Sequence, residues 1–217
     1  MRLPFADRAA AGDALAKRLE HLAARRPLVL GLPRGGVVVA ARIAERLQAP
    51  LDVVIVRKIG TPGHRELAMG ALAMWGPHSA VVRNEHVIAS AGVSDAEFRR
   101  AREREADEAR RRVAEWGHPV PDITDTDVVL VDDGLATGAT MHAAVEVARR
   151  AGAGRLICAV PVGAPDELSE LAEQVDEVVY IDAPRQFHAV GLHYRDFREV
   201  DDATVADALA AARERVS

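Results

Sequence analysis

Short apolar runs alternate along the chain with longer stretches in which apolar residues recur at helical spacing. Strands are predicted at residues 28–32, 51–57, 128–132, 155–160 and 177–181, with short strand-like pieces near 71–75 and 80–83. Helices are predicted at residues 7–25, 37–48, 94–116, 139–152, 165–174 and 202–215. Strands that alternate with helices predict an α/β fold, a doubly wound and mostly parallel sheet flanked by helices.

Two segments interrupt this alternation. Residues 58–67 (KIGTPGHREL) are rich in glycine, proline and charge, which predicts an exposed, mobile connection of the kind that often has a function. Ser94 and Glu97 form a capping box that opens the charged helix 94–116. Its acids nearly balance its arginines, so a solvated helix docked along one apolar stripe is favoured over a nucleic-acid-binding one.

Length and composition narrow the class of protein. A chain of 217 residues fits one domain, here 1–217. The formal charge of -5 gives no overall attraction to nucleic acid or to an anionic membrane, so the expected partner is a small molecule. Cys158, the one cysteine, lies among apolar residues and is interpreted as core. No leader or membrane span is recognisable, so a cytoplasmic location is expected.

The stretch VVLVDDGLATGATM, residues 128–141, contains the candidate chemistry. Asp132 and Asp133 fall at the carboxyl end of a predicted strand, where ligands bind in open parallel sheets. The following small residues enter a helix, so backbone N–H groups and the hydroxyls of Thr137 and Thr140 can converge on a phosphate. Carboxylates beside a phosphate loop indicate a ribose 5-phosphate.

Other interpretations of this loop are weaker. It lacks the lysine of a Walker A loop and the glycine spacing of a dinucleotide fingerprint. A role only as caps for the next helix is disfavoured, because two adjacent buried aspartates with no nearby basic partner would be costly for that purpose.

These residues resemble the phosphoribosyl-pyrophosphate (PRPP) motif of the type I phosphoribosyltransferases. The early LPRGG resembles the pyrophosphate loop of that family, and RKIGTPGHRELAMGAL resembles its mobile catalytic loop. The resemblance extends over about residues 5–205, and the tail FHAVGLHYRDF is similar to bacterial members whose substrate is not obvious. It implies the family fold, with a small hood built from the N-terminal segment and about residues 184–200, and a homodimer.

The resemblance also implies roles for individual residues. Asp132 and Asp133 would bind the ribose hydroxyls and hold the cofactor Mg²⁺, mostly through water. The 5-phosphate would be bound by Leu135, Ala136, Thr137, Gly138, Ala139 and Thr140, and pyrophosphate by Pro33, Arg34, Gly35 and Gly36.

The implied reaction displaces pyrophosphate from the anomeric carbon of PRPP by a nitrogen of a small acceptor. Arg57 and Lys58 would stabilise the charge that develops on the leaving group, with Arg65 as a further candidate. Glu66 is the preferred candidate for proton transfer, ahead of His64.

The acceptor stays open. Enzymes acting on 6-oxopurines carry a third aspartate in the motif where this chain has Ala136. The hood residues Phe187, Val190 and Tyr194 are candidates for contact with a base, although such aromatics, Phe197 above all, can equally fill the core of the hood. Two other functions remain: a regulatory protein that senses PRPP without turnover, and an enzyme acting on an amine or water.

Overall fold

The computed structural model describes residues 4–116 and 121–216. Its main sheet has five strands in the order β2-β1-β6-β7-β8, and every neighbouring pair is parallel. The strands are β1 (Leu28–Gly31), β2 (Leu51–Val53), β6 (Asp127–Val131), β7 (Arg155–Val162) and β8 (Glu177–Asp182). The predicted parallel α/β architecture is confirmed.

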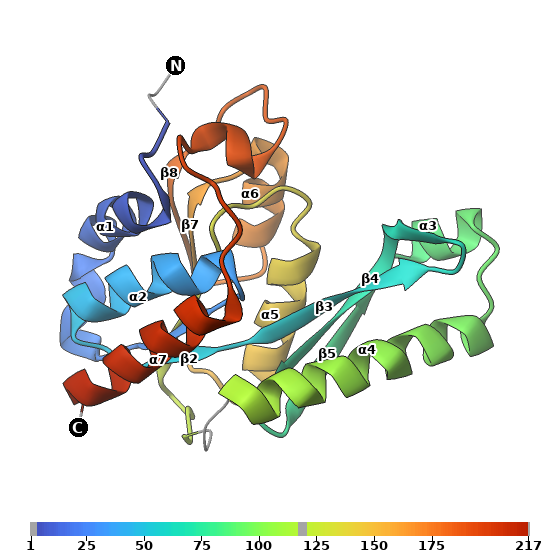
Figure 1. Ribbon diagram of the computed structural model, residues 1–217, viewed down its shortest axis with the longest axis horizontal. Coiled ribbons are helices and arrows are strands. Elements are labelled where there is room, and N and C mark those ends of the chain that lie inside the picture. Colours follow the sequence, from blue (N-terminus) through green and yellow to red (C-terminus); the bar gives the residue numbers. More distant parts are fainter. Residues whose placement is uncertain (1–3, 117–120, 217) are drawn as a thin grey trace.

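Helices cover both faces of this sheet (Figure 1). Side chains alternate along β6, so that Val129 and Val131 pack in one apolar core while Val128 and Leu130 pack in the other. The first core includes residues of α1 (Arg8–Arg18), α2 (Gly35–Leu47) and α7 (Asp202–Val216), and the second those of α5 (Ala139–Arg150) and α6 (Pro165–Ala172). The predicted first helix is divided, because a 3-10 helix (Glu20–Arg25) follows α1.

A second, antiparallel sheet projects from the body of the molecule (Figure 1). It consists of β3 (Ile55–Thr61), β4 (His64–Trp75) and β5 (His78–Arg83). The helix α4 (Asp95–Trp116) runs along it, and the short helix α3 (Glu85–Ser90), which the sequence did not predict, precedes α4. We call β3, β4, β5, α3 and α4 the arm.

The arm corrects two predictions. The strand expected at 51–57 is divided between the two sheets. The N–H of Val54 still donates to the carbonyl of Gly31 in the parallel sheet, and the antiparallel sheet begins at Ile55. The connection expected at 58–67 is mainly a β-hairpin, in which Ile59 and Thr61 are buried and Gly63, at φ 80°, makes the turn. Glycine and proline around the turn conceal the alternating pattern in the sequence.

The predicted start and docking of α4 are confirmed. The carboxylate of Glu97 accepts hydrogen bonds from the N–H of Ser94 at 2.9 Å and from its hydroxyl at 2.7 Å, and these bonds lower the pKa of Glu97. One stripe of the helix is buried: Phe98, Ala101, Ala109 and Trp116. The other faces are solvated and contain arginine-to-acid pairs within the helix.

Two smaller observations bear on the predicted class. Cys158 is buried on β7, as expected, and burial raises the pKa of its thiol. Among the helices within residues 4–116 and 121–216, none combines the length and the apolar character needed to cross a membrane.

The N-terminal segment and the tail segment, residues 184–200, lie against each other. The N–H of Phe5 donates to the carbonyl of His193 at 2.8 Å, and the N–H of Arg195 donates to the carbonyl of Phe5 at 2.8 Å. A short 3-10 helix, Val190–His193, interrupts the tail segment. These are the two segments expected to form the hood, and their role toward a bound acceptor stays a prediction.

Candidate active site

The two motifs singled out in the sequence meet at the carboxyl-terminal ends of the strands of the parallel sheet, which we call the carboxyl edge. Strands β1 and β6 are neighbours, with Gly31 opposite Val131, so the segments that follow them begin side by side. A Cβ atom added at Gly36 would lie 2.6 Å from the carbonyl oxygen of Val131, and one at Gly35 would lie 1.9 Å from Oδ2 of Asp133. Only glycine permits this approach of α2 to the aspartates.

The PRGG segment differs in one respect from the predicted turn. Gly35 and Gly36 already form the first turn of α2, and Arg34 is its N-cap residue. The backbone N–H groups that would bind pyrophosphate therefore belong to a helix N-terminus, which favours an anion through its dipole.

Asp132 and Asp133 form a largely buried acid pair. Oδ1 of Asp132 accepts a hydrogen bond from the N–H of Asp133 at 2.8 Å. Oδ2 of Asp133 accepts one from Nε of Arg8 at 2.7 Å, and the two side chains of this ion pair are only 17% and 11% exposed. The guanidinium of Arg8 also stacks over Phe197, 3.8 Å from the ring centroid.

Arg8 is a residue of the site that sequence reasoning missed. It precedes Asp133 by 125 positions, and no motif surrounds it. The premise that the aspartates lack a basic partner was therefore wrong in three dimensions, although it held for their neighbours in the sequence.

Burial dominates the electrostatics of the acid pair. It raises the pKa of Asp132 well above the ordinary value, and the charge of Asp133 raises it further. The N–H of Asp133, Arg8 and Lys58 act in the opposite direction. Burial also raises the pKa of Asp133, against the opposing effect of Arg8. A ligand that donates hydrogen bonds or brings a cation would relieve this cost.

The loop between β6 and α5 presents free backbone donors. Among the described residues, no backbone carbonyl accepts from the amides of Ala136, Thr137 or Gly138, and no side chain caps α5. Gly138 adopts φ 64°, which favours glycine at this turn. The hydroxyls of Thr137 and Thr140 likewise have no hydrogen-bond partner among the described residues. This geometry suits an anion at the helix N-terminus.

Two of the six residues predicted to bind phosphate have engaged amides. The N–H of Leu135 donates to the carbonyl of Val162 at 2.9 Å, and that of Ala139 donates to the carbonyl of Thr137 at 2.7 Å. The side chain of Leu135 is buried. Leu135 thus fixes the loop to the end of β7, and the free donors are those of its neighbours.

Arg34 points toward acids in the present structure. Its guanidinium pairs with Glu199 and lies 3.6 Å from Asp202. A cavity of about 180 Å³ beside it is lined by Pro33, Arg34, Ile55, Val56, Arg57, Arg112 and Trp116. Three arginines around one cavity suit an anion, and Arg112 and Trp116 of α4 are residues that the sequence motifs did not indicate.

The arm residues proposed for catalysis are divided. Nε of Arg57 donates to Glu105 on α4 at 3.0 Å. Lys58 is exposed, yet it is near enough to lower the pKa of Asp132. Glu66 and His64 are exposed at the start of β4, where the hairpin projects away from the parallel sheet (Figure 1). The structure thus brings Lys58 toward the acid pair but not Glu66.

The tail segment gives its three candidate residues different surroundings. Tyr194 is 6% exposed, its hydroxyl donates to the carbonyl of Asp133 at 2.6 Å, and its ring packs between Phe5 and Phe197. Tyr194 therefore packs within the hood together with Phe197, and contact of Tyr194 with a base stays a prediction. Val190 and Phe187 are half-buried and remain candidates for that contact.

Comparison with known proteins agrees with this arrangement. Residues 6–195 match the family model described as the phosphoribosyl transferase domain. This chain belongs to the phosphoribosyl transferase domain family. The match includes the loops after β1 and β6 and most of the tail segment.

Individual relatives of this phosphoribosyl transferase domain protein support the assignment. A Mycobacterium tuberculosis protein, provisionally named a phosphoribosyl transferase, is 42% identical over 200 residues, which is 91% of this chain and 44% of that protein. The chain thus spans less than half the length of this relative. The crystal structure of TT1426 from Thermus thermophilus has a TM-score of 0.80 at 42% identity and covers 96% of this chain and 99% of its own.

A more distant structure shares only the fold. The AQ2163 protein from Aquifex aeolicus is 13% identical, with a TM-score of 0.50, and covers 94% of this chain and 85% of its own.

Proposed function

We propose that the protein transfers the 5-phosphoribosyl group from PRPP to a nitrogen of a small acceptor, with a nucleobase as the first candidate, and releases pyrophosphate. One observation carries the proposal: the acid pair, the loop with free amides and the N-terminus of α2 converge at one edge of the sheet. Membership of the phosphoribosyl transferase domain family supports it.

Each part of PRPP would meet a different part of this edge. Asp132 and Asp133 would accept hydrogen bonds from vicinal ribose hydroxyls, and the amides of Ala136, Thr137 and Gly138 would donate to the 5-phosphate. Arg34 and the first turn of α2 would bind the pyrophosphate, after Arg34 exchanges its partners Glu199 and Asp202 for the ligand.

The acid pair fits the Mg²⁺ that the family implies. Two adjacent carboxylates, whose pKa values burial raises, are stabilised by a nearby cation. Mg²⁺ prefers oxygen ligands and keeps several waters, so Asp132 and Asp133 would hold it largely through water. When bound, it would neutralise charge on the pyrophosphate.

The proposed reaction forms a bond between the acceptor nitrogen and the anomeric carbon while the bond from that carbon to the pyrophosphate oxygen breaks. The electron pair leaves with pyrophosphate. Arg57 and Lys58 would stabilise the developing negative charge, which requires Arg57 to leave Glu105. Glu66 would accept the proton of the acceptor if the hairpin closes over the edge, and Phe187 and Val190 would contact the acceptor.

The test is mass spectrometry of the protein incubated with Mg²⁺, PRPP and a mixture of nucleobases and small amines. A new phosphoribosylated mass is expected with the unmodified chain and with Asp166→Asn, a matched control on the exposed face of α6. Asp132→Asn combined with Asp133→Asn should give none, because the ribose hydroxyls lose their ionised acceptors.

The other outcomes separate the alternative functions. Ribose 5-phosphate and pyrophosphate as the only products would identify water as the acceptor. Binding of PRPP and Mg²⁺ without any product across the mixture would favour a PRPP-sensing protein. Binding that persists unchanged in the double variant would show that the site has been assigned to the wrong residues.

A further inference from the structure

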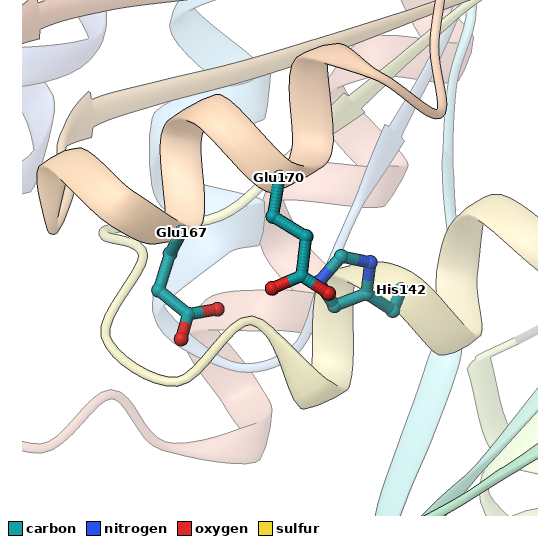
Figure 2. A group of neighbouring side chains, drawn as sticks. All are labelled: His142, Glu167 and Glu170. Carbon is teal, nitrogen blue, oxygen red and sulfur yellow. The ribbon is translucent and has the colours of Figure 1, made fainter.

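A second group of side chains, of the types that can bind a metal, lies between α5 and α6. Figure 2 shows His142, from the first turns of α5, and Glu167 and Glu170, from α6, pointing toward one another. One ligand atom from each lies within 4.8 Å of the other two. Glu167 and Glu170 are three residues apart, so both carboxylates leave the same face of α6. We call these three residues the histidine cluster.

The imidazole of the histidine cluster is oriented from outside the cluster. Nδ1 of His142 lies 3.0 Å from Oε1 of Gln174. The amide nitrogen of Gln174 in turn lies 3.5 Å from the carbonyl of Glu170, so its oxygen is the atom that faces the ring. Since this oxygen only accepts, Nδ1 donates to it, and Nε2 is the ring nitrogen left to bind a metal. Metal-binding histidines are commonly fixed in this way.

Neither arginine nor lysine neutralises the carboxylates of the histidine cluster in the described part of the chain. Within residues 4–116 and 121–216, neither Glu167 nor Glu170 makes an ion pair with arginine or lysine, or a side-chain hydrogen bond. Burial and the charge of Glu170 raise the pKa of Glu167, and His142 opposes them. Two like charges held together without compensation favour a bound cation.

The local backbone brings the donor atoms together. A Cβ atom added at Gly138 would lie 2.4 Å from Oε2 of Glu167 and 2.8 Å from Nε2 of His142. Both donors therefore converge over the Cα of Gly138, where any side chain would displace them. A cavity of about 370 Å³, lined in part by His142, Glu170, Gln174, Glu146 and Arg149, reaches the cluster from the surface.

We propose that the histidine cluster binds a divalent first-row transition metal such as Zn²⁺ through Nε2 of His142 and one oxygen each of Glu167 and Glu170, with water completing the coordination. An imidazole nitrogen favours these metals over Mg²⁺. Binding needs a modest movement, since ligand atoms about 2 Å from a metal lie closer together than 4.8 Å, and the exposed Glu170 can turn inward. The metal would join α6 to the start of α5.

The experiment is titration of the metal-free protein with Co²⁺, followed by its visible absorption, and displacement by Zn²⁺, with excess Mg²⁺ present throughout to occupy oxygen-only sites. One equivalent should bind the unmodified chain. His142→Gln and Glu167→Gln should each lose this binding, because each removes a ligand. Gln174→Ala should weaken it by about 10-fold, the effect typical of a residue that orients a metal ligand.

Two exposed residues outside the cluster provide matched controls, His86→Gln on α3 and Glu173→Gln just after α6. Both should bind Co²⁺ as the unmodified chain does. Hydrogen exchange gives a second measurement, since Zn²⁺ should slow exchange of the amides at residues 138–142 in the unmodified chain and not in His142→Gln. Absence of saturable binding, equal binding by His142→Gln, or equal loss in His86→Gln would each overturn the proposal.

Discussion

The carboxyl edge of the parallel sheet and the arm both contribute charged residues to the proposed reaction, but they hold them differently. At the edge, the ion pair of Arg8 and Asp133 is 11% and 17% exposed. On the arm, the ion pair of Arg57 and Glu105 is 42% and 27% exposed. Water competes little for the first pair and strongly for the second, so only the first is held by the fold.

This difference suggests separate roles for the two regions under the proposed function: the edge would bind the ligand, and the arm would close over it. The edge residues are fixed by strand pairing and by glycines that admit no other side chain, and such rigidity is what a binding site for a defined ligand requires. The arm residues can exchange partners at little cost when the hairpin moves. Under the proposed function, PRPP would be recognised at the edge, and the arm would respond to it.

The largest effect is expected from removing the buried cation. Arg8→Ala leaves Asp133 buried beside Asp132 with no opposite charge, which should lower the free energy of unfolding by about 3 kcal/mol at neutral pH. Arg57→Ala breaks an exposed pair and should cost less than about 1 kcal/mol. Urea unfolding of both variants at pH 7 measures the two values.

A double-mutant cycle tests the cause of this loss. Adding Asp133→Asn to Arg8→Ala removes the unpaired charge and should restore part of the stability, while the packing of Arg8 on Phe197 stays lost. Equal losses for Arg8→Ala and Arg57→Ala would contradict the distinction between edge and arm.

A smaller effect, of opposite sign, is expected from Asp132→Asn. The pKa of Asp132 is raised in the folded protein, so ionisation destabilises the fold as the pH rises from the ordinary carboxyl value through the raised one. Asparagine avoids this cost and can still accept from the N–H of Asp133. The variant should gain about 1 kcal/mol of stability at alkaline pH, as is common when a functional site is neutralised.

Urea unfolding between pH 4 and pH 9 tests this dependence. The advantage of Asp132→Asn should shrink as the pH falls toward the ordinary value of about 3.9, because the folded state and an increasing fraction of the unfolded state then bind the proton. Glu173→Gln, an exposed substitution, should show no such trend. A constant difference at every pH would show that ionisation of Asp132 does not limit stability.

The edge could be predicted from the sequence because local rules determine it. Apolar runs ending near Gly31 and Val131, each followed by small residues and a helix, place two loops at the carboxyl end of a parallel sheet. The pairing of β1 with β6 itself was not indicated by the pattern. This pairing depends on packing of the whole sheet, so the strand order is known from the structure and not from the sequence.

The arm and the partners of the acid pair were not predicted from the sequence, and the reasons are physical. Glycine and proline in KIGTPGHREL conceal a hairpin whose strands are stabilised by packing on α4 and by each other. The contact of Arg8 with Asp133 joins residues 125 positions apart, and the histidine cluster joins two helices. Contacts between distant segments leave no periodicity in the sequence.

The smallest expected effect comes from Glu167, a negatively charged residue at the carboxyl edge that disfavours a bound anion. Glu167 lies over Gly138, at the loop proposed to bind the 5-phosphate, so in metal-free solution its charge should oppose phosphate binding. Glu167→Gln should bind ribose 5-phosphate about 3-fold more tightly at low salt, an advantage that salt should reduce by screening. Calorimetric titration measures both, with Glu173→Gln as the matched control. An unchanged affinity in Glu167→Gln would mean that the phosphate does not bind at this loop or that Glu167 is already neutral there.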